Sequence, residues 1–249
     1  MSGHSKWSSI KHKKAATDAR RGKLFAKLIR GVESAARDGG TSNPANDMTL
    51  AAAVERAKQY SVPTDTIERA AKRGAGELDE GVRYERVLYE GYAPGGVAVL
   101  VEALTENRNR TSAELRSVFT RNGGNLGEPG SVAWMFSKLG LIVVSAAASE
   151  DDVVAAAAEA GAEDIRPSDE GWEVVSAAKE FARVRKAIAD AGLQIERSEL
   201  TMLPQSTVSL DAGKARPVLR LIDAIEELED VQEVFANFDV PDEVLAEVS

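Results

Sequence analysis

The chain has 249 residues, of which 43% are hydrophobic and 29% charged, a composition typical of folded domains rather than disordered segments. It contains no cysteine, which excludes disulfides, thiolate metal sites and cysteine catalysis and fits a reducing compartment. No apolar run approaches the roughly 18 residues that suggest a membrane span, and the N-terminus lacks a signal-peptide core. We therefore expect a cytoplasmic protein without a membrane partner.

The formal net charge of −9 is distributed unevenly along the chain. Residues 1–37 hold ten lysines and arginines against two acidic residues, a net charge of +8, so the remainder carries −17. Phosphates respond to the local potential within about one Debye length, roughly 8–10 Å, so a basic segment on an acidic body can still bind them. The distribution predicts a basic N-terminal region that binds a polyanion and a body that discourages indiscriminate wrapping.

Residues 1–76 are expected to form a basic helical domain with a mobile or extended N-terminal arm (residues 1–14). The arm lacks a regular apolar period, whereas the following segment places apolar residues on one helical stripe and ends at Gly39-Gly40. Three helices with short connections are predicted, and they start near Ala15, after Asp47 and after Pro63.

From residue 82 the pattern changes to that of a mixed α/β structure. Two apolar strands at 84–92 and 97–104 flank an Ala-Pro-Gly-Gly sequence, which is typical of a hairpin. The Thr-Ser-Ala-Glu sequence at 111–114 resembles a capping box, and we expect it to open the next helix.

Two short strands are then predicted at 132–136 and 141–144, separated by a turn around Leu139-Gly140. Over residues 140–204 the expected elements are strand, helix, strand, strand, helix and strand. This βαββαβ order is that of the ferredoxin-like plait.

The elements after Pro204 are a short strand, a helix and a strand, which lack a complete set of partners of their own. They would complete the unit that precedes the plait, so we expect a discontinuous α/β domain (82–137 plus 205–249) with residues 140–204 inserted into it. The predicted fold class is α+β and multidomain, with a three-helix domain followed by two α/β domains.

The residue types that enzymes use are sparse. Both histidines lie in the predicted arm, and the nucleophile-elbow, P-loop and dinucleotide motifs are missing. The glycine-rich stretch 122–130 could cradle a phosphate, but it lacks a lysine and a structural role is favoured. Adjacent carboxylates on a helix point in different directions. We therefore expect acidic pairs such as Glu229-Asp230 to be solvated or to cap helices, and not to act in acid–base catalysis. We predict no catalytic residue, metal site, cofactor or small-molecule substrate.

The basic N-terminal region gives the strongest functional signal. It interleaves cations with an aromatic side chain that can stack on a base, and the basic helix continues it. A merely solvated surface is the alternative, but the excess positive charge is larger than solubility requires. The candidate nucleic-acid-binding residues are Lys6, Trp7, Lys11, His12, Lys13, Lys14, Arg20, Arg21, Lys23, Lys27 and Arg30.

A secondary anion contact is predicted at Arg108 and Arg110, which follow a strand and precede a helix N-terminus. The alternative has equal weight: a polar loop whose arginines pair with the acidic body.

Several motifs resemble the YebC/PmpR family of transcriptional regulators. They are GHSKW at 3–7, IKHKK at 10–14, RGK at 21–23, YEGY at 89–92 with PGG at 94–96, NRNRT at 107–111, and GGNLG at 123–127 with GSV at 130–132. The resemblance implies three domains, the first helical and the others α/β, in a cytoplasmic protein without a cofactor. Glu106 departs from the aspartate expected in that loop.

The resemblance also implies two kinds of partner, because the family is described as binding promoter DNA and as acting on stalled ribosomes. A mitochondrial relative is a translational activator of cytochrome c oxidase. Our first hypothesis is a DNA-binding transcriptional regulator, and the alternative is a ribosome- or RNA-associated translation factor. An enzyme is a distant third. The sequence does not settle the oligomeric state, although a monomer is compatible with it.

Overall fold

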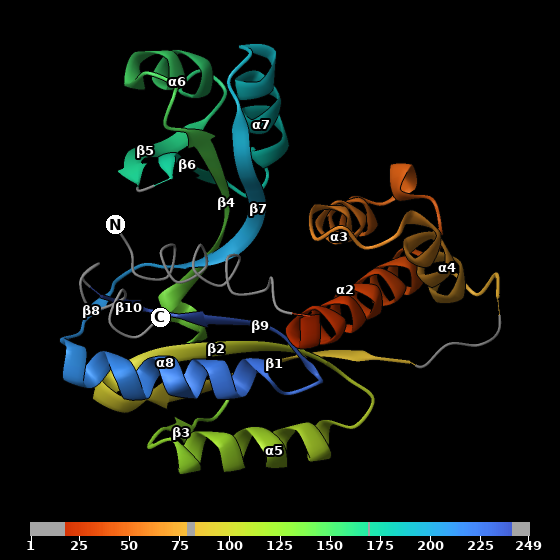
Figure 1. Ribbon diagram of the computed structural model, residues 1–249, viewed down its shortest axis with the longest axis vertical. Helices are drawn as coiled ribbons and strands as arrows, with labels where there is room; N and C mark the ends of the chain where they lie inside the picture. The colour runs from red at the N-terminus through yellow and green to blue at the C-terminus, as the bar shows by residue number, and fades with distance from the viewer. Residues whose placement is uncertain (1–17, 79–82, 169, 241–249) are drawn as a thin grey trace.

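The computed structural model describes residues 18–78, 83–168 and 170–240 (Figure 1). It contains a helical unit, two four-stranded antiparallel sheets with helices packed on them, and a small parallel strand pair, which confirms the predicted α+β class. In these residues no helix combines the length and apolar character needed to cross a bilayer.

The helical unit has an apolar core of its own. Leu28 and Val32 of the first helix pack with Leu50, Val54 and Ile67 of the two that follow, and each side chain is buried. The predicted helix start near Ala15 lies outside the described residues. The elements of this unit are α2 (Asp18–Gly39), η1 (Pro44–Asn46), α3 (Met48–Gln59) and α4 (Thr64–Gly74).

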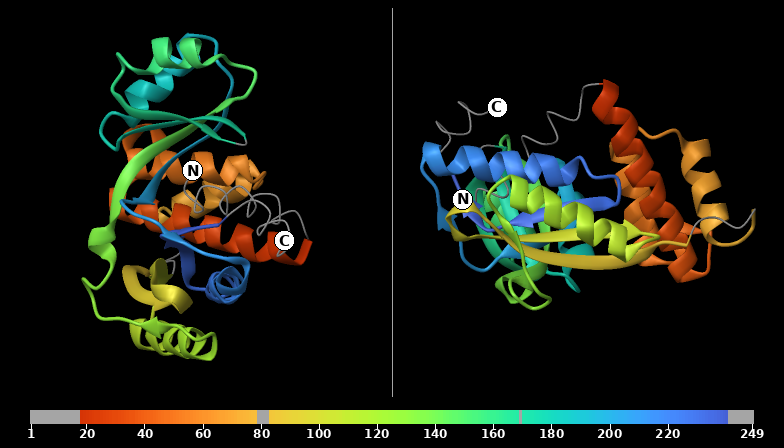
Figure 2. Two further views of the ribbon diagram at one scale, coloured as in Figure 1. Left: turned by 90° about the vertical axis from the view of Figure 1, so that its left-hand side faces the viewer. Right: turned by 90° about the horizontal axis from the view of Figure 1, so that it is seen from below.

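The first sheet has the order β3-β1-β2-β9, and two helices pack on one of its faces (Figures 1 and 2). Val99 and Val101 on that face contact Leu115 and Phe119 of one helix and Ile222 of the other in a single buried cluster. The elements are β1 (Glu85–Ala93), η2 (Pro94–Gly96), β2 (Val97–Thr105), α5 (Arg108–Arg121), β3 (Asn125–Leu126), α8 (Ala212–Glu226) and β9 (Val231–Ala236).

Strands from both sides of the intervening unit share this sheet. The antiparallel pairing of β2 with β9 places Val101 opposite Val234. A short parallel pair, β8 (Val208–Ser209) with β10 (Phe238–Asp239), extends the same region. Our division into residues 1–76, 82–137 plus 205–249, and 140–204 remains an interpretation of this topology.

The second sheet is fully antiparallel with the order β5-β6-β4-β7, the strand order of the ferredoxin-like plait. Two helices contribute Val153, Val184 and Ile188 to a core that they share with Ile142 and Val174 of the strands. The elements are β4 (Phe136–Ser145), α6 (Glu150–Ala157), β5 (Ala162–Ser168), β6 (Gly171–Ala177), α7 (Phe181–Asp190) and β7 (Ile195–Pro204).

The predicted turn at Leu139-Gly140 is wrong, because β4 runs unbroken through both residues. A Cβ atom on Gly140 would lie 2.5 Å from Cδ2 of Phe181. The glycine therefore serves the close packing of α7 on the strand, which sequence alone does not distinguish from a turn. The strand predicted at 132–136 is mostly a short 3-10 turn, η3 (Ala133–Met135).

The predicted capping box at 111–114 is also wrong, because α5 already begins at Arg108. Asn107 is its N-cap residue, and its side chain accepts a hydrogen bond of 3.1 Å from the backbone N–H of Arg110. Asparagine is as good an N-cap as threonine. Thr111 instead lies buried in the first helical turn, where its hydroxyl bonds side chains from other elements.

A paired glycine substitution tests the packing of α4 on α2. A Cβ atom on Gly74 would collide with the carbonyl oxygen of Glu33 and lie 2.8 Å from the Cβ of Ala36. Gly74→Ala should therefore destabilise the helical unit by about 1–3 kcal/mol.

Gly22→Ala is the matched control, because nothing lies within 4 Å of its Cβ position and helix interiors favour alanine. We expect it to raise stability by up to about 1 kcal/mol. Urea denaturation followed by circular dichroism measures both, and equal effects of the two substitutions would contradict this packing.

Candidate nucleic-acid interface

The predicted interface residues fall into three groups. Arg20 and Arg21 belong to the first turns of α2, and only their backbone is described. Lys23, Lys27 and Arg30 of the same helix are described with their side chains. The arm residues Lys6, Trp7, Lys11, His12, Lys13 and Lys14 lie outside the described residues.

The three described cations contact the turn between α8 and β9. Lys23 Nζ lies 2.5 Å from a carboxylate oxygen of Glu227, and Lys27 Nζ donates to the carbonyl oxygen of Glu226 at 2.5 Å. Arg30 donates to the carbonyl and the carboxylate of Glu229, both at 2.8 Å. One face of α2 is thus held against the acidic end of α8.

Helix geometry explains this docking. Residues four and three apart lie on one helical face, so the spacing 23, 27 and 30 aligns the three cations. The C-terminal end of α8 carries the negative end of its dipole and unpaired carbonyls, which favour cations. Arg30 also lies over the ring of Tyr84, with its guanidinium carbon 5.0 Å from the ring centre.

Asp230 joins α2, α5 and β2 through one carboxylate. Its side chain is only 5% exposed. Arg110 donates to its two oxygens at 2.9 and 3.2 Å, and the hydroxyl of Thr111 donates at 2.6 Å. Arg30 approaches the same carboxylate at 3.4 Å. The solvated role predicted for the Glu229-Asp230 pair is therefore wrong for Asp230.

The environment of Asp230 holds it ionised. Burial acts to raise the pKa of this carboxyl, but hydrogen bonds from Thr111, Arg110 and Thr105, with the charge of Arg110, outweigh it and lower the pKa below its usual value. A buried carboxylate needs this number of donors because an uncompensated buried charge is costly.

Ion pairs contribute to the contact between the helical unit and the first sheet. Arg56 of α3 forms a further ion pair with Glu233 of β9. The apolar clusters of the two units have no residue in common. Since exposed ion pairs are screened by salt, the Lys23–Glu227 pair should weaken at high ionic strength, whereas the buried Arg30–Asp230 pair should weaken much less.

Arg108 and Arg110 are both engaged by acidic residues. Arg108 lies 3.2 Å from Glu85 in an exposed pair, and Arg110 bonds Asp230. This arrangement corresponds to the second alternative for the loop, in which its arginines pair with the acidic body.

The glycine-rich stretch encloses a carboxylate of the chain itself. Glu90, 6% exposed, accepts hydrogen bonds of 2.6 to 2.7 Å from the backbone N–H groups of Gly130, Val132 and Ala133. Burial acts to raise the pKa of Glu90, but these three donors lower it. The backbone N–H groups of Gly123, Gly124 and Gly127 donate to backbone carbonyls, so these donors are occupied as well and the loop acts as scaffold.

The roles of Glu90 and Asp230 are not evident from the sequence. The only sequence signal for Glu90 is its place within the YEGY motif, between residues that alternate toward the core. Asp230 carries no distinguishing signal in the sequence, because its side-chain partners on α2 and α5 lie more than 100 residues away from it along the chain.

Two family models cover nearly the whole chain. Residues 5–77 match the N-terminal domain of TACO1/YebC proteins, and residues 84–238 match their second and third domains. The chain belongs to the TACO1/YebC family. The resemblance inferred from the motifs is thereby confirmed.

Relatives from other bacteria align over the full length. A protein of Beutenbergia cavernae is 54% identical over 100% of this chain and 99% of its own. One of Thermobifida fusca is 52% identical over 100% of both. Each is called a probable transcriptional regulatory protein. The crystal structure of a conserved hypothetical protein from Aquifex aeolicus, 48% identical, matches with a TM-score of 0.80 over 92% of this chain and 94% of that one.

Replacing the carboxylate of Asp230, at the contact between the helical unit and the first sheet, should destabilise this TACO1/YebC protein in a pH-dependent way. Asp230→Asn leaves Arg110 and Arg30 without their buried counter-charge, so we expect a loss of about 3 kcal/mol at pH 7. The pKa of Asp230 is lower in the folded protein than in the unfolded chain, where an aspartate has a pKa of roughly 3.9. The ionised carboxylate therefore stabilises the folded state above that pH, and this contribution is lost as the pH falls through the folded-state pKa. The difference between wild type and variant should therefore shrink below about pH 4.

Glu227→Gln is the matched control, since it removes an ion pair between side chains that are 62% and 51% exposed. Such pairs contribute at most about 1 kcal/mol. Chemical denaturation at pH 7 and pH 3 separates the two, and a pH-independent loss for Asp230→Asn would contradict the role given to its charge.

Proposed function

We propose that this chain is a nucleic-acid-binding regulator of transcription that acts in the cytoplasm and has no enzymatic activity of its own. The observation that carries the proposal is the net charge of +8 on residues 1–37 within a chain of net charge −9. Such a concentration of cations supplies the sequence-independent part of nucleic-acid affinity. The names of the relatives support the regulatory role.

The docking of α2 suggests a division among the predicted contacts. Lys23, Lys27 and Arg30 already bond the acidic end of α8, so they position the helical unit on the body. The arm cations and Arg20 and Arg21 then provide the first contacts with phosphates. Lys23 is 62% exposed and can exchange Glu227 for a phosphate, whereas Arg30 is 12% exposed and stays structural.

A ribosome- or RNA-associated translation factor is the second candidate. One face of the basic helix α2 packs on the body, which leaves less of its surface for insertion into a major groove. A basic arm on a plait-containing body suits structured RNA, which proteins recognise largely by shape and phosphates. Both candidates predict the same charge-dependent binding and differ in which nucleic acid is preferred.

Charge reversal in the arm tests the proposal. Lys11→Glu, Lys13→Glu and Lys14→Glu together should weaken binding to duplex DNA and to structured RNA by at least roughly tenfold, because each cation that contacts a phosphate contributes through counterion release. Fluorescence anisotropy with labelled nucleic acid measures the effect. The triple change Lys138→Glu, Lys179→Glu and Lys186→Glu, at exposed positions of the plait, is the control with equal net charge. Undiminished binding by a normally folded arm variant would exclude the arm as the contact.

Salt dependence provides an independent measure. If about six cations contact phosphates, the logarithm of affinity should fall with the logarithm of salt concentration with a slope of about −4 for single strands to about −5.4 for duplex DNA. Binding titrations with labelled nucleic acid at salt concentrations from about 50 to about 200 mM measure this slope. A slope near zero would show that contacts other than ion pairs dominate.

A further inference from the structure

The helical layer on the first sheet, formed by α5 and α8, carries positive charge within an acidic body. Residues 81–249 have a net charge of −14, because residues 1–80 carry +5 of the total of −9. Yet α5 holds four arginines against one glutamate, Glu114. In α8, Lys214, Arg216 and Arg220 all precede Asp223, the first acidic residue of the helix.

The two helices run in opposite directions (Figures 1 and 2). The second half of α5, with Arg116 and Arg121, therefore lies beside the basic first half of α8. The end of α5 and the start of α8 meet at the β1–β2 hairpin, where Gly123 faces Pro94 and Gly95 faces Leu210. The acidic end of α8 lies at the opposite end, where α2 neutralises it. The hairpin end is therefore basic.

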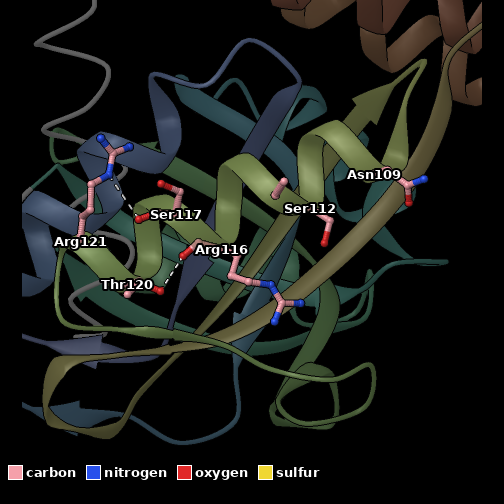
Figure 3. Close-up of a pocket in the computed structure, with 7 residues that line it drawn as sticks. Asn109, Ser112, Arg116, Ser117, Thr120 and Arg121 are labelled. Carbon is pink, nitrogen blue, oxygen red and sulfur yellow. Dashed lines mark hydrogen bonds between the residues drawn. The ribbon is translucent and has the colours of Figure 1, made fainter.

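The outer face of α5 forms a shallow open depression, the α5 face, which runs along the helix from its first turn to the basic hairpin end. Figure 3 shows its polar side chains projecting from one side of the helix, away from the core. Asparagine, serine and threonine side chains donate hydrogen bonds to phosphate and sugar oxygens, as arginines do. The α5 face is lined by Asn109, Ser112, Ala113, Arg116, Ser117, Thr120 and Arg121.

Two arginines of the α5 face have no acidic partner in the part of the chain that the structure describes. Arg116 is exposed and its guanidinium extends into solvent. Arg121 donates from Nε to the carbonyl oxygen of Ser117 at 3.3 Å, which orients the guanidinium without neutralising it. By contrast, Arg108 and Arg110 at the start of the helix are both paired.

We propose that the α5 face binds the sugar–phosphate backbone of the nucleic acid that the N-terminal region captures. The inference rests on the proposed function and adds a second contact, on the outer face of α5. Charge complementarity supports a polyanion. The lining includes no large apolar side chain, which a protein partner would need as an anchor.

The position of α5 connects the two contacts. Its first turn bonds Asp230, which also bonds Arg30 of α2, so the helix starts where the basic helical unit is docked. From there α5 extends over 14 residues, roughly 20 Å, toward the hairpin end. One backbone running from α2 along α5 would therefore meet Arg116 and Arg121 about two to four helical turns away.

The first experiment reverses charge on the α5 face of the full-length chain. Arg116→Glu with Arg121→Glu should weaken binding to duplex DNA or structured RNA by roughly fivefold or more and reduce the salt slope by about 2. Lys179→Glu with Lys186→Glu makes the same change in net charge on the plait and should leave the slope nearly unchanged. Both pairs are exposed, so melting curves should match that of the wild type.

The second experiment uses the absence of cysteine from the sequence. Ser117→Cys on the α5 face and Ala155→Cys on an exposed position of α6 each provide a single site for a photocrosslinker. We expect nucleic acid to crosslink from position 117 and not from 155. Position 117 depends on neither arginine, so this result stands even where the charge-reversed variant fails to fold.

The outcomes distinguish the two proposals. If wild type binds no nucleic acid, the proposed function fails. If the arm variant loses binding while the α5 variant behaves like its control and position 117 does not crosslink, the proposed function stands and the α5 contact is excluded. Crosslinking of position 117 to ribosomal protein rather than to nucleic acid also overturns the inference. DNA and RNA probes, compared side by side, identify the source of the backbone.

Discussion

The ionised carboxylate of Asp230 is the interaction on which the arrangement of the helical unit and the first sheet depends. It is 5% exposed and receives Arg30 from α2, Arg110 and Thr111 from α5, and Thr105 from β2. A buried charge is tolerated only when its partners are all in place, so each of these segments limits the position of the others. Because α2 and the sheet share no apolar cluster, this carboxylate and the exposed pairs around it set how the helical unit sits.

A second buried carboxylate, Glu90, orders the loop after β3 in the same manner. Its three backbone donors are Gly130, Val132 and Ala133, and the same loop makes a close approach at Gly127, where a Cβ would lie 2.6 Å from the hydroxyl oxygen of Ser131. The motifs at 89–92 and 123–132 therefore encode one structural device, a carboxylate enclosed by a glycine-rich loop. The glycine-rich sequence that resembles a phosphate-binding loop therefore maintains the scaffold.

The patterns that depend on local sequence were predictable, and those that depend on tertiary partners were not. Helical and strand periods gave the α+β class and the βαββαβ order, because apolar faces repeat within each element. The start of α5 was misplaced because Thr111, a good cap by type, is used to bond Asp230. Gly140 was assigned to a turn because its neighbour Phe181 is distant in sequence. The docking of Lys23, Lys27 and Arg30 was likewise hidden, since the acids that they meet lie about 200 residues away.

Segregation of charge reconciles an acidic body with a polyanionic partner. The acidic end of α8 serves as an internal counterpart of phosphate, because it binds the same α2 cations that a nucleic acid would attract. The cations of α2 therefore reduce the repulsion between the acidic end of α8 and a phosphate. Toward the β1–β2 hairpin, the layer formed by α5 and α8 is positively charged. A nucleic-acid backbone bound as proposed would compete with Glu227 for Lys23 but not with Asp230 for Arg30, since burial strengthens the second contact and solvent screens the first. Partial exchange of this kind would let the protein bind phosphates without releasing the helical unit from the sheet.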